Sequence, residues 1–179
     1  MNDKNSIIQL YLLQIKNNGI AGDLFLKLNE KEKTFLERKE DKYYLKNEVR
    51  NKIKVVLTGG VFDIIHLGHI FTLSEAKKYG DVLIVSVARD EFINKKGRTP
   101  LHDQESRAKL IQSIKGVDFA IIGYIHPEEL VSNVGPDVIV YGYDQKPFLK
   151  PEGVKIVKLE KGINEVELKT GKLIEKFGL

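Results

Sequence analysis

The spacing of apolar positions changes near residue 53. Beyond it, short runs that are almost wholly apolar alternate with segments whose apolar residues recur at helical spacing. Strands that are apolar throughout are typical of a parallel sheet covered by helices on both faces. The expected strands are residues 53–58, 82–87, 119–122, 138–141 and 154–159, and the expected helices are residues 68–79, 103–114, 127–133 and 165–177. The alternation predicts an α/β domain with a doubly wound parallel sheet, in which ligands bind beyond the carboxyl ends of the strands.

The first 50 residues lack this alternation. Residues 6–17 can form a helix that is apolar nearly all round, and such a helix must be buried against something. Two short helices, 22–28 and 30–39, are expected next, followed by a strand in "DKYYLKN". We therefore divide the chain into a small, mainly helical region of residues 1–50 and a domain of residues 51–179. Three short helices and a hairpin-like piece suggest a winged helix, although a packing or dimerising appendage is the interpretation we prefer.

Composition narrows the classes of protein that fit. The chain has 179 residues and no cysteine, which excludes disulfides, thiolate metal sites and a cysteine nucleophile. No apolar run approaches the roughly 20 residues that cross a bilayer, so we expect a cytoplasmic protein without membrane contact. The net charge of +4 is mild, and residues 1–52 carry 11 Lys+Arg against 8 Asp+Glu. We interpret this excess as a solvated surface, with nucleic-acid binding through residues 1–50 as the alternative.

The stretch "VVLTGGVFDIIHLGH" carries the clearest chemical signal. An apolar run meets the paired Gly59 and Gly60, and His66 and His69 then flank the start of an expected helix. A helix start presents unbonded N–H groups and a positive dipole end, which together attract anions. Two imidazoles facing that place could donate to the oxygens of a polyphosphate and stabilise charge that develops during a transfer reaction.

Two other interpretations of these histidines were weighed. They could be ordinary residues at a helix start, but a pair around a glycine after a glycine-rich strand end makes this the weaker reading. They could also bind zinc, but His-x-x-His without a third ligand is an incomplete zinc site. His102 and His126 have no comparable setting.

The segment "GGVFDIIHLGH" resembles the signature of the cytidylyltransferase-like nucleotidyltransferase superfamily, whose core is the H-x-G-H motif. The resemblance extends over roughly residues 53–160. It implies a Rossmann-like enzyme that transfers a nucleoside monophosphate from a nucleoside triphosphate to a phosphate-bearing acceptor and releases pyrophosphate. It further implies a divalent metal, usually Mg²⁺, and a homodimer. The matching positions for nucleotide binding are Gly60, Val61, Phe62, His66, Leu67, Gly68 and His69, with His66 and His69 as catalytic residues.

Later segments point to a branch of that family. "VARDEF" and "GYDQ" resemble archaeal FMN adenylyltransferases, also called FAD synthases. "KKGRTPLHDQESR" is shared in style with both that branch and the glycerol-3-phosphate cytidylyltransferases. Asp144 would contact the nucleotide, and Gln145 stands where the glycerol-3-phosphate branch tends to carry Trp. We therefore favour ATP and FMN as substrates. The alternatives are CTP with glycerol 3-phosphate or a similar alcohol phosphate, and a DNA-binding regulator that only senses a nucleotide.

Further phosphate contacts are expected from basic residues outside the signature. Lys95, Lys96 and Arg98 form a basic run, from which we choose Lys96 as the catalytic clamp on the β- and γ-phosphates. Arg107 could contact the acceptor or the triphosphate, or merely pair with Glu105. The family's C-terminal Ser/Thr-rich phosphate loop is reduced here to Thr170, so its phosphate contact is in doubt. Val61 also departs from the family, because many relatives have Thr there and Val lacks the hydroxyl.

Overall fold

The computed structural model describes residues 3–95 and 97–160. The chain forms two compact units, Met1–Lys54 and Val55–Leu179. None of the helices found in these residues is long and apolar enough to cross a membrane.

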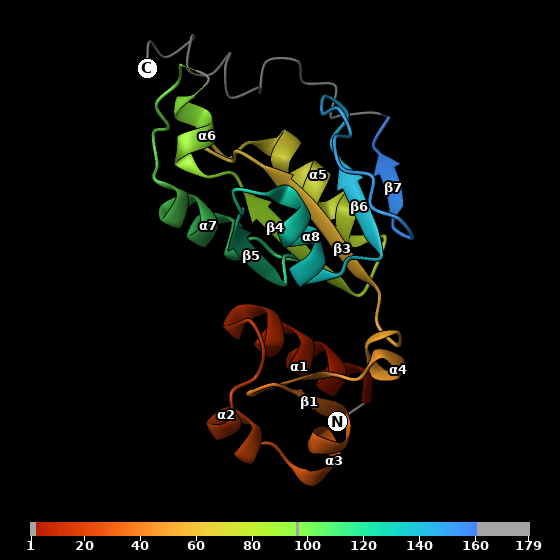
Figure 1. Cartoon of the computed structure of the whole chain (residues 1–179). Coiled ribbons are helices and arrows are strands. Elements are labelled where there is room, and N and C mark those ends of the chain that lie inside the picture. Colours follow the sequence, from red (N-terminus) through yellow and green to blue (C-terminus); the bar gives the residue numbers. More distant parts are fainter. Residues whose placement is uncertain (1–2, 96, 161–179) are drawn as a thin grey trace. The chain divides into compact units, whose positions relative to one another are not determined.

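The second unit is built on a five-stranded parallel sheet with the order β5-β4-β3-β6-β7 (Figure 1). Its strands are β3 (Val55–Gly60), β4 (Val82–Val87), β5 (Phe119–Ile122), β6 (Val138–Tyr141) and β7 (Lys155–Lys158). Val56 on the central strand β3 is in register with Leu83 of β4 on one side and Val138 of β6 on the other. The strand order reverses between β3 and β6, which creates a switch point at their carboxyl ends. The prediction of a doubly wound α/β sheet is confirmed.

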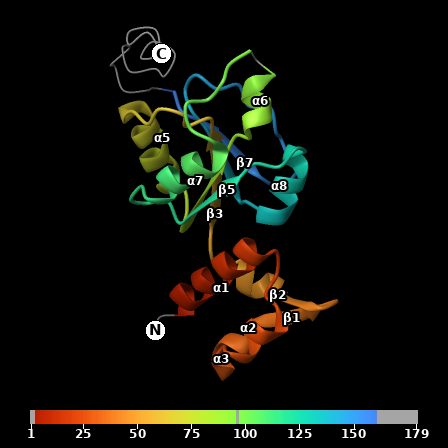
Figure 2. The ribbon, with the colours of Figure 1, turned by 90° about the vertical axis from the view of Figure 1, so that its left-hand side faces the viewer.

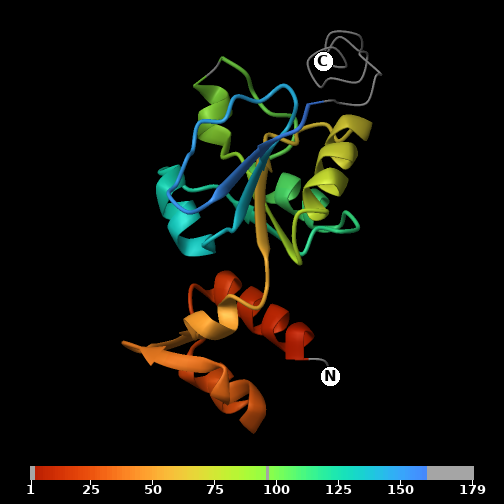
Figure 3. The same cartoon turned by 90° about the vertical axis from the view of Figure 1, so that its right-hand side faces the viewer.

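Helices cover both faces of this sheet. They are α5 (Leu67–Lys77), α6 (Asp90–Asn94), α7 (Gln104–Gln112) and α8 (Pro127–Val134). Figures 2 and 3 show α5 and α7 on one face and α8 on the other. Alternate strand residues such as Val56, Val85 and Val140 belong to one buried cluster with Leu73 of α5 and Ile111 of α7. The strand residues between them face α8, as the two-residue period of a strand requires.

The predicted elements of this unit agree closely with the structure. β4, β5 and β6 have the expected bounds, and the other predicted strands and helices differ by at most two residues at either end. The short helix α6 was not predicted. The helix expected at residues 165–177 lies outside the described residues.

The first unit contains α1 (Asp3–Asn17), α2 (Gly22–Leu26), α3 (Glu30–Thr34), the antiparallel pair β1 (Leu36–Lys39) and β2 (Lys42–Leu45), and α4 (Asn47–Arg50). Ile7, Leu10, Tyr11 and Ile15 of α1 are buried, as expected for so apolar a helix. Ile20 forms a single antiparallel bridge to Tyr43 of β2. The order of these elements is that of a winged helix: first helix α1, then the bridging residue Ile20, the short helices α2 and α3, and the hairpin.

One prediction for this unit is wrong. Residues 30–39 were expected to form a single helix, but α3 ends at Thr34 and β1 begins at Leu36. Leu36 is buried and pairs with the buried Leu45 of β2, and Glu40 takes a left-handed conformation in the turn between the strands. Burial of this cross-strand leucine pair outweighs the helix preference of the lysine- and glutamate-rich segment.

Candidate active site

The turn that follows β3 folds back over the end of its own strand. Phe62 is buried and adopts a left-handed backbone conformation with a φ of 53°. Its ring leaves no room for a side chain at Gly60, because a Cβ there would lie 2.8 Å from that ring. A left-handed phenylalanine costs on the order of 1 kcal/mol, which burial of its ring offsets. The paired glycines therefore serve to bring the backbone of this turn close to the strand end.

The two histidines meet at the start of α5. His66 is the N-cap residue of the helix and His69 lies in its first turn, as the sequence predicted. Their rings stack with centroids 3.8 Å apart and an interplanar angle of 24°. The Phe62 ring contacts His69 edge-on at a centroid distance of 5.1 Å. The aromatic stack fixes the direction in which the imidazoles point.

Both imidazoles carry a buried nitrogen that lacks a protein partner. The Nδ1 atoms of His66 and His69 have no hydrogen-bond partner among residues 3–95 and 97–160. Buried polar atoms in folded proteins are normally paired, so an unpaired one calls for a functional explanation.

The electrostatic setting keeps these rings neutral. The pKa of His69 is lowered to about 4, mainly by burial and also by the neighbouring His66, whereas the Asp144 carboxylate and a hydrogen bond with the Ile64 backbone act in the opposite direction. Burial also lowers the pKa of His66, again opposed by Asp144. Asp144 comes from the loop after β6, so the structure brings the three predicted residues His66, His69 and Asp144 into one electrostatic neighbourhood. A polyanion bound there would favour the charged imidazoles and so oppose the effect of burial.

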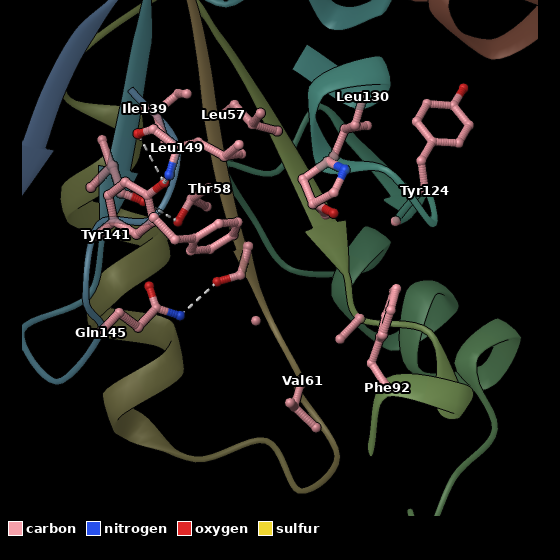
Figure 4. Close-up of a pocket in the computed structure, with 18 of the residues that line it drawn as sticks. Leu57, Thr58, Val61, Phe92, Tyr124, Leu130, Ile139, Tyr141, Gln145 and Leu149 are labelled. Carbon is pink, nitrogen blue, oxygen red and sulfur yellow. Dashed lines mark hydrogen bonds between the residues drawn. The ribbon is translucent and has the colours of Figure 1, made fainter. Parts of the chain in front are cut away.

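Gln145 holds the Asp144 loop against the strand end (Figure 4). Its Oε1 accepts a hydrogen bond from the Gly142 amide at 2.8 Å, and its Nε2 donates to the Gly59 carbonyl at 2.9 Å. The sequence treated Gln145 only as a marker of the branch. Its role as a tether was missed because the partner Gly59 is 86 residues away in the chain.

A cavity opens beside this turn, on the α8 side of the sheet. Its volume is about 350 Å³, within the usual range for small-molecule sites. Phe148 at the cavity is 72% exposed although it is a large apolar side chain. Figure 4 shows side chains from several elements around the cavity, among them Leu57, Val61, Phe92, Tyr124, Leu130, Ile139, Tyr141 and Leu149. The sequence did not predict this cavity, because its lining comes from strands, a helix and loops far apart in the chain.

Arg107 lies inside the protein rather than at the ligand edge. Its side chain is 0% exposed and forms an ion pair with Asp90, so the predicted pairing with Glu105 is not what the structure has. Its guanidinium also donates to three backbone carbonyls, those of His102 at 3.0 Å, Val61 at 2.5 Å and Ala88 at 2.8 Å. These contacts make Arg107 an internal tie between the turn after β3 and the end of β4.

Asp63 provides a second tie that the sequence did not predict. Its buried carboxylate accepts hydrogen bonds from the Leu101 amide at 2.9 Å and the His102 amide at 3.1 Å. The loop before α7 is thereby fixed to the same turn as Arg107. The signal in the sequence was the pair Phe62 and Asp63 just before the histidines. The family resemblance points to the histidines rather than to Asp63.

The structure says less about the four other residues that were predicted to contact phosphate. Lys95 and Arg98 are exposed, and Lys95 lies 5.6 Å from the centroid of the Phe92 ring. Lys96 and Thr170 lie outside the described residues. Phosphate binding by these four residues stays a prediction.

Comparisons with known proteins agree with this geometry. The family described as cytidylyltransferase-like matches residues 57–172. An FAD synthase from Thermoplasma acidophilum is 52% identical over 94 residues, which cover 51% of this chain and 65% of that protein. An FAD synthase from Pyrococcus horikoshii is 43% identical over 140 residues, which cover 70% of this chain and 93% of that protein. The chain thus spans about two thirds of the length of the Thermoplasma relative and most of the Pyrococcus one.

A solved structure shows a related fold. The crystal structure of the lipopolysaccharide core biosynthesis protein from Thermoplasma volcanium GSS1 is 42% identical and has a TM-score of 0.55. The match covers 60% of this chain and 96% of that one.

Proposed function

This chain belongs to the cytidylyltransferase-like family, and we propose that it transfers AMP from ATP to the phosphate of FMN, giving FAD and pyrophosphate. The observation that carries the choice of acceptor is the aromatic-lined cavity, which Gly60 and Val61 of the turn before the histidine pair help to line. It offers a largely apolar surface for a planar flavin ring, whereas glycerol 3-phosphate has no apolar group to bury. The FAD synthase relatives support the same choice.

The reaction needs positioning and charge stabilisation rather than a nucleophilic side chain. An oxygen of the FMN phosphate attacks the α-phosphorus of ATP in line, and the bond from that phosphorus to the bridging oxygen breaks. Pyrophosphate leaves with the bonding electron pair. His66 and His69 would donate hydrogen bonds to the oxygens that gain charge in the transition state. No general base is required, because the attacking phosphate is already ionised.

The remaining site residues would orient the nucleotide. The backbone of Gly60, Val61 and Phe62 would line it, together with Leu67 and Gly68 at the helix start. Because Gly60 and Val61 also line the cavity, the nucleotide and the flavin would meet at this turn. Asp144 would hold the base or the ribose, and Lys96 would contact the β- and γ-phosphates. Val61 still offers its backbone N–H, so loss of the threonine hydroxyl found in many relatives removes only a side-chain contact.

A divalent cation, proposed as Mg²⁺, would enter with ATP. In the part of the chain that the structure describes, no three His, Cys, Asp or Glu side chains gather closely enough to hold a metal ion. Mg²⁺ at such sites is commonly held by substrate phosphates with one or two carboxylates, which needs no such cluster. Asp144 is the carboxylate placed beside the histidine pair. The bound cation would supply charge neutralisation on the phosphates.

One experiment tests the whole proposal. The purified chain is incubated with each nucleoside triphosphate crossed with FMN, glycerol 3-phosphate and phosphocholine, and pyrophosphate release is measured. We expect release with ATP and FMN. Release with CTP and glycerol 3-phosphate instead would make the chain a cytidylyltransferase, and no release with any pair would leave the nucleotide-sensing regulator. A homodimer and a cytoplasmic location stay predictions.

A further inference from the structure

One charged side chain lines the apolar cavity. Of the residues the structure places around it, only Arg89 carries a charge. Its side chain is 34% exposed, and its Nε donates to the Glu91 carboxylate at 2.9 Å. A partly exposed arginine can turn the remaining N–H groups of its planar guanidinium towards an anion.

Arg89 stands close to the turn that carries the histidines. It follows the end of β4, where Val87 is in register with Gly60 of β3 and the Ala88 amide donates to the Gly60 carbonyl at 2.9 Å. Neighbouring strands are about 4.8 Å apart, so Arg89 lies one strand away from the start of the catalytic turn.

The backbone on both sides of Arg89 is fixed. The carbonyl of Ala88 accepts a hydrogen bond from the buried Arg107 at 2.8 Å, and Asp90 forms an ion pair with the same guanidinium. Two contacts from one buried residue therefore hold the chain immediately before and after Arg89. The backbone that carries the Arg89 side chain is therefore already in place, so ligand binding has only the side chain to order.

Resting on the proposed function, we propose that Arg89 binds the phosphate of the acceptor and selects phosphorylated flavin. The cavity can bury the ring of either FMN or riboflavin, because the two share that ring. Only FMN carries a phosphate, and a guanidinium matches a phosphate with two parallel hydrogen bonds. Arg89 would hold that phosphate at the cavity mouth, beside the turn from which transfer proceeds.

The alternative is that Arg89 and Glu91 form an ordinary surface ion pair. Such a pair contributes about 0–1 kcal/mol to stability and gives no preference between the two flavins. Binding of FMN and riboflavin therefore separates the two interpretations.

The test uses the full chain and the fluorescence of each flavin. Dissociation constants for FMN and riboflavin are measured for the wild type, Arg89→Met and Arg89→Lys. For Arg89→Met we expect the FMN dissociation constant to rise by about 10- to 100-fold, as for loss of a charge-assisted contact. Riboflavin binding should stay within about twofold, because the apolar cavity is unchanged. Arg38→Met in the first unit is the matched control, since Arg38 is also exposed and donates to a local oxygen, the Glu40 carbonyl.

Each outcome of these measurements supports or overturns either the role of Arg89 or the proposed acceptor. An Arg89→Met variant that keeps the wild-type preference for FMN overturns the role of Arg89 and leaves the proposed function standing. Wild-type protein that binds neither flavin overturns the proposed acceptor. If Arg89→Met loses riboflavin as well, Arg89→Lys decides: a variant that binds riboflavin and still prefers FMN supports the phosphate contact, and one that binds riboflavin without that preference rejects it. In turnover assays the KM for FMN should rise while the KM for ATP does not, and the reverse would place Arg89 on the triphosphate instead.

Discussion

His69 has an imidazole that the folded protein holds in its neutral form. Burial is the main cause, and it lowers the pKa from an ordinary value of 6.5 to about 4. The unfolded chain therefore binds a proton at His69 more readily than the folded chain does. Stability depends on this ring, and so does catalysis under the proposed mechanism, and each dependence can be measured.

The first prediction concerns stability against pH. The unfolded state binds a proton as pH falls through 6.5, while folded His69 stays unprotonated down to about 4. His69 therefore makes its full contribution to stability above pH 6.5, and this contribution decreases as pH falls from 6.5 towards 4. Between pH 7 and pH 5 we expect a loss on the order of 1–2 kcal/mol from this residue, with allowance for its partial exposure. This loss is measured by urea unfolding of the wild type and His69→Asn at both pH values. Equal losses in the two proteins would refute the prediction.

The second prediction concerns turnover. His69→Ala removes a donor to the charge that develops on the transferred phosphoryl group. We expect kcat to fall by about 100-fold or more, as for loss of one transition-state donor elsewhere. Pyrophosphate release gives kcat, and far-ultraviolet circular dichroism checks that the fold is intact. Near-normal turnover in the folded variant would remove His69 from the mechanism.

At the scale of elements, Arg107 joins pieces that the chain order keeps apart. It lies on α7 and binds the turn after β3, the end of β4 and the loop that precedes its own helix. The site depends on the relative position of the first two of these. A buried arginine with four partners is thus part of the support for the active site rather than a ligand contact.

A third prediction follows for this tie. Arg107→Met leaves the Asp90 carboxylate and three backbone carbonyls without their donor. Breaking one side of a buried ion pair typically costs about 3–5 kcal/mol, and we expect a loss of that size in the free energy of unfolding. Urea unfolding measures it, with Lys109→Met on the exposed face of α7 as the matched control. A loss no larger than that of the control would show that the tie contributes nothing.

The elements that could be predicted are those that local pattern determines. The strands β4, β5 and β6 had the expected bounds, because each is a short apolar run between turn residues. The pairing of His66 and His69 followed from their spacing at a helix start. In the hairpin of the first unit, strand β1 was missed because it is specified by its partner β2 rather than by its own residues. The Asp63 and Arg107 ties and the cavity were missed for a similar reason, since each joins residues that lie far apart in the sequence.

At the scale of the whole molecule, the site residues fall in one of the two units. All the site residues that the structure describes belong to the unit Val55–Leu179, and the family match begins at residue 57. The first unit has its own buried residues and its own hairpin. In α3, Lys33 pairs with Glu30 and Lys31 pairs with Asp3, and both are surface ion pairs.

The fourth prediction tests this division. A fragment of residues 55–179 should fold and transfer AMP to FMN with a kcat within about threefold of the full chain, since a domain with its own core can fold alone. Pyrophosphate release by the fragment and the full chain measures this. A folded fragment without activity would instead assign residues 1–54 a part in the reaction.

The Gln145 amide has a consequence for how nucleotide preference could change. It accepts from Gly142 and donates to Gly59 at the same time, whereas an indole has one donor and no acceptor. A tryptophan at this position could not make both hydrogen bonds, and the loop bearing Asp144 would have to settle elsewhere. Under the proposed role of Asp144 at the base, selectivity between two bases would shift with the orientation of this carboxylate, with every group that touches the base left chemically the same.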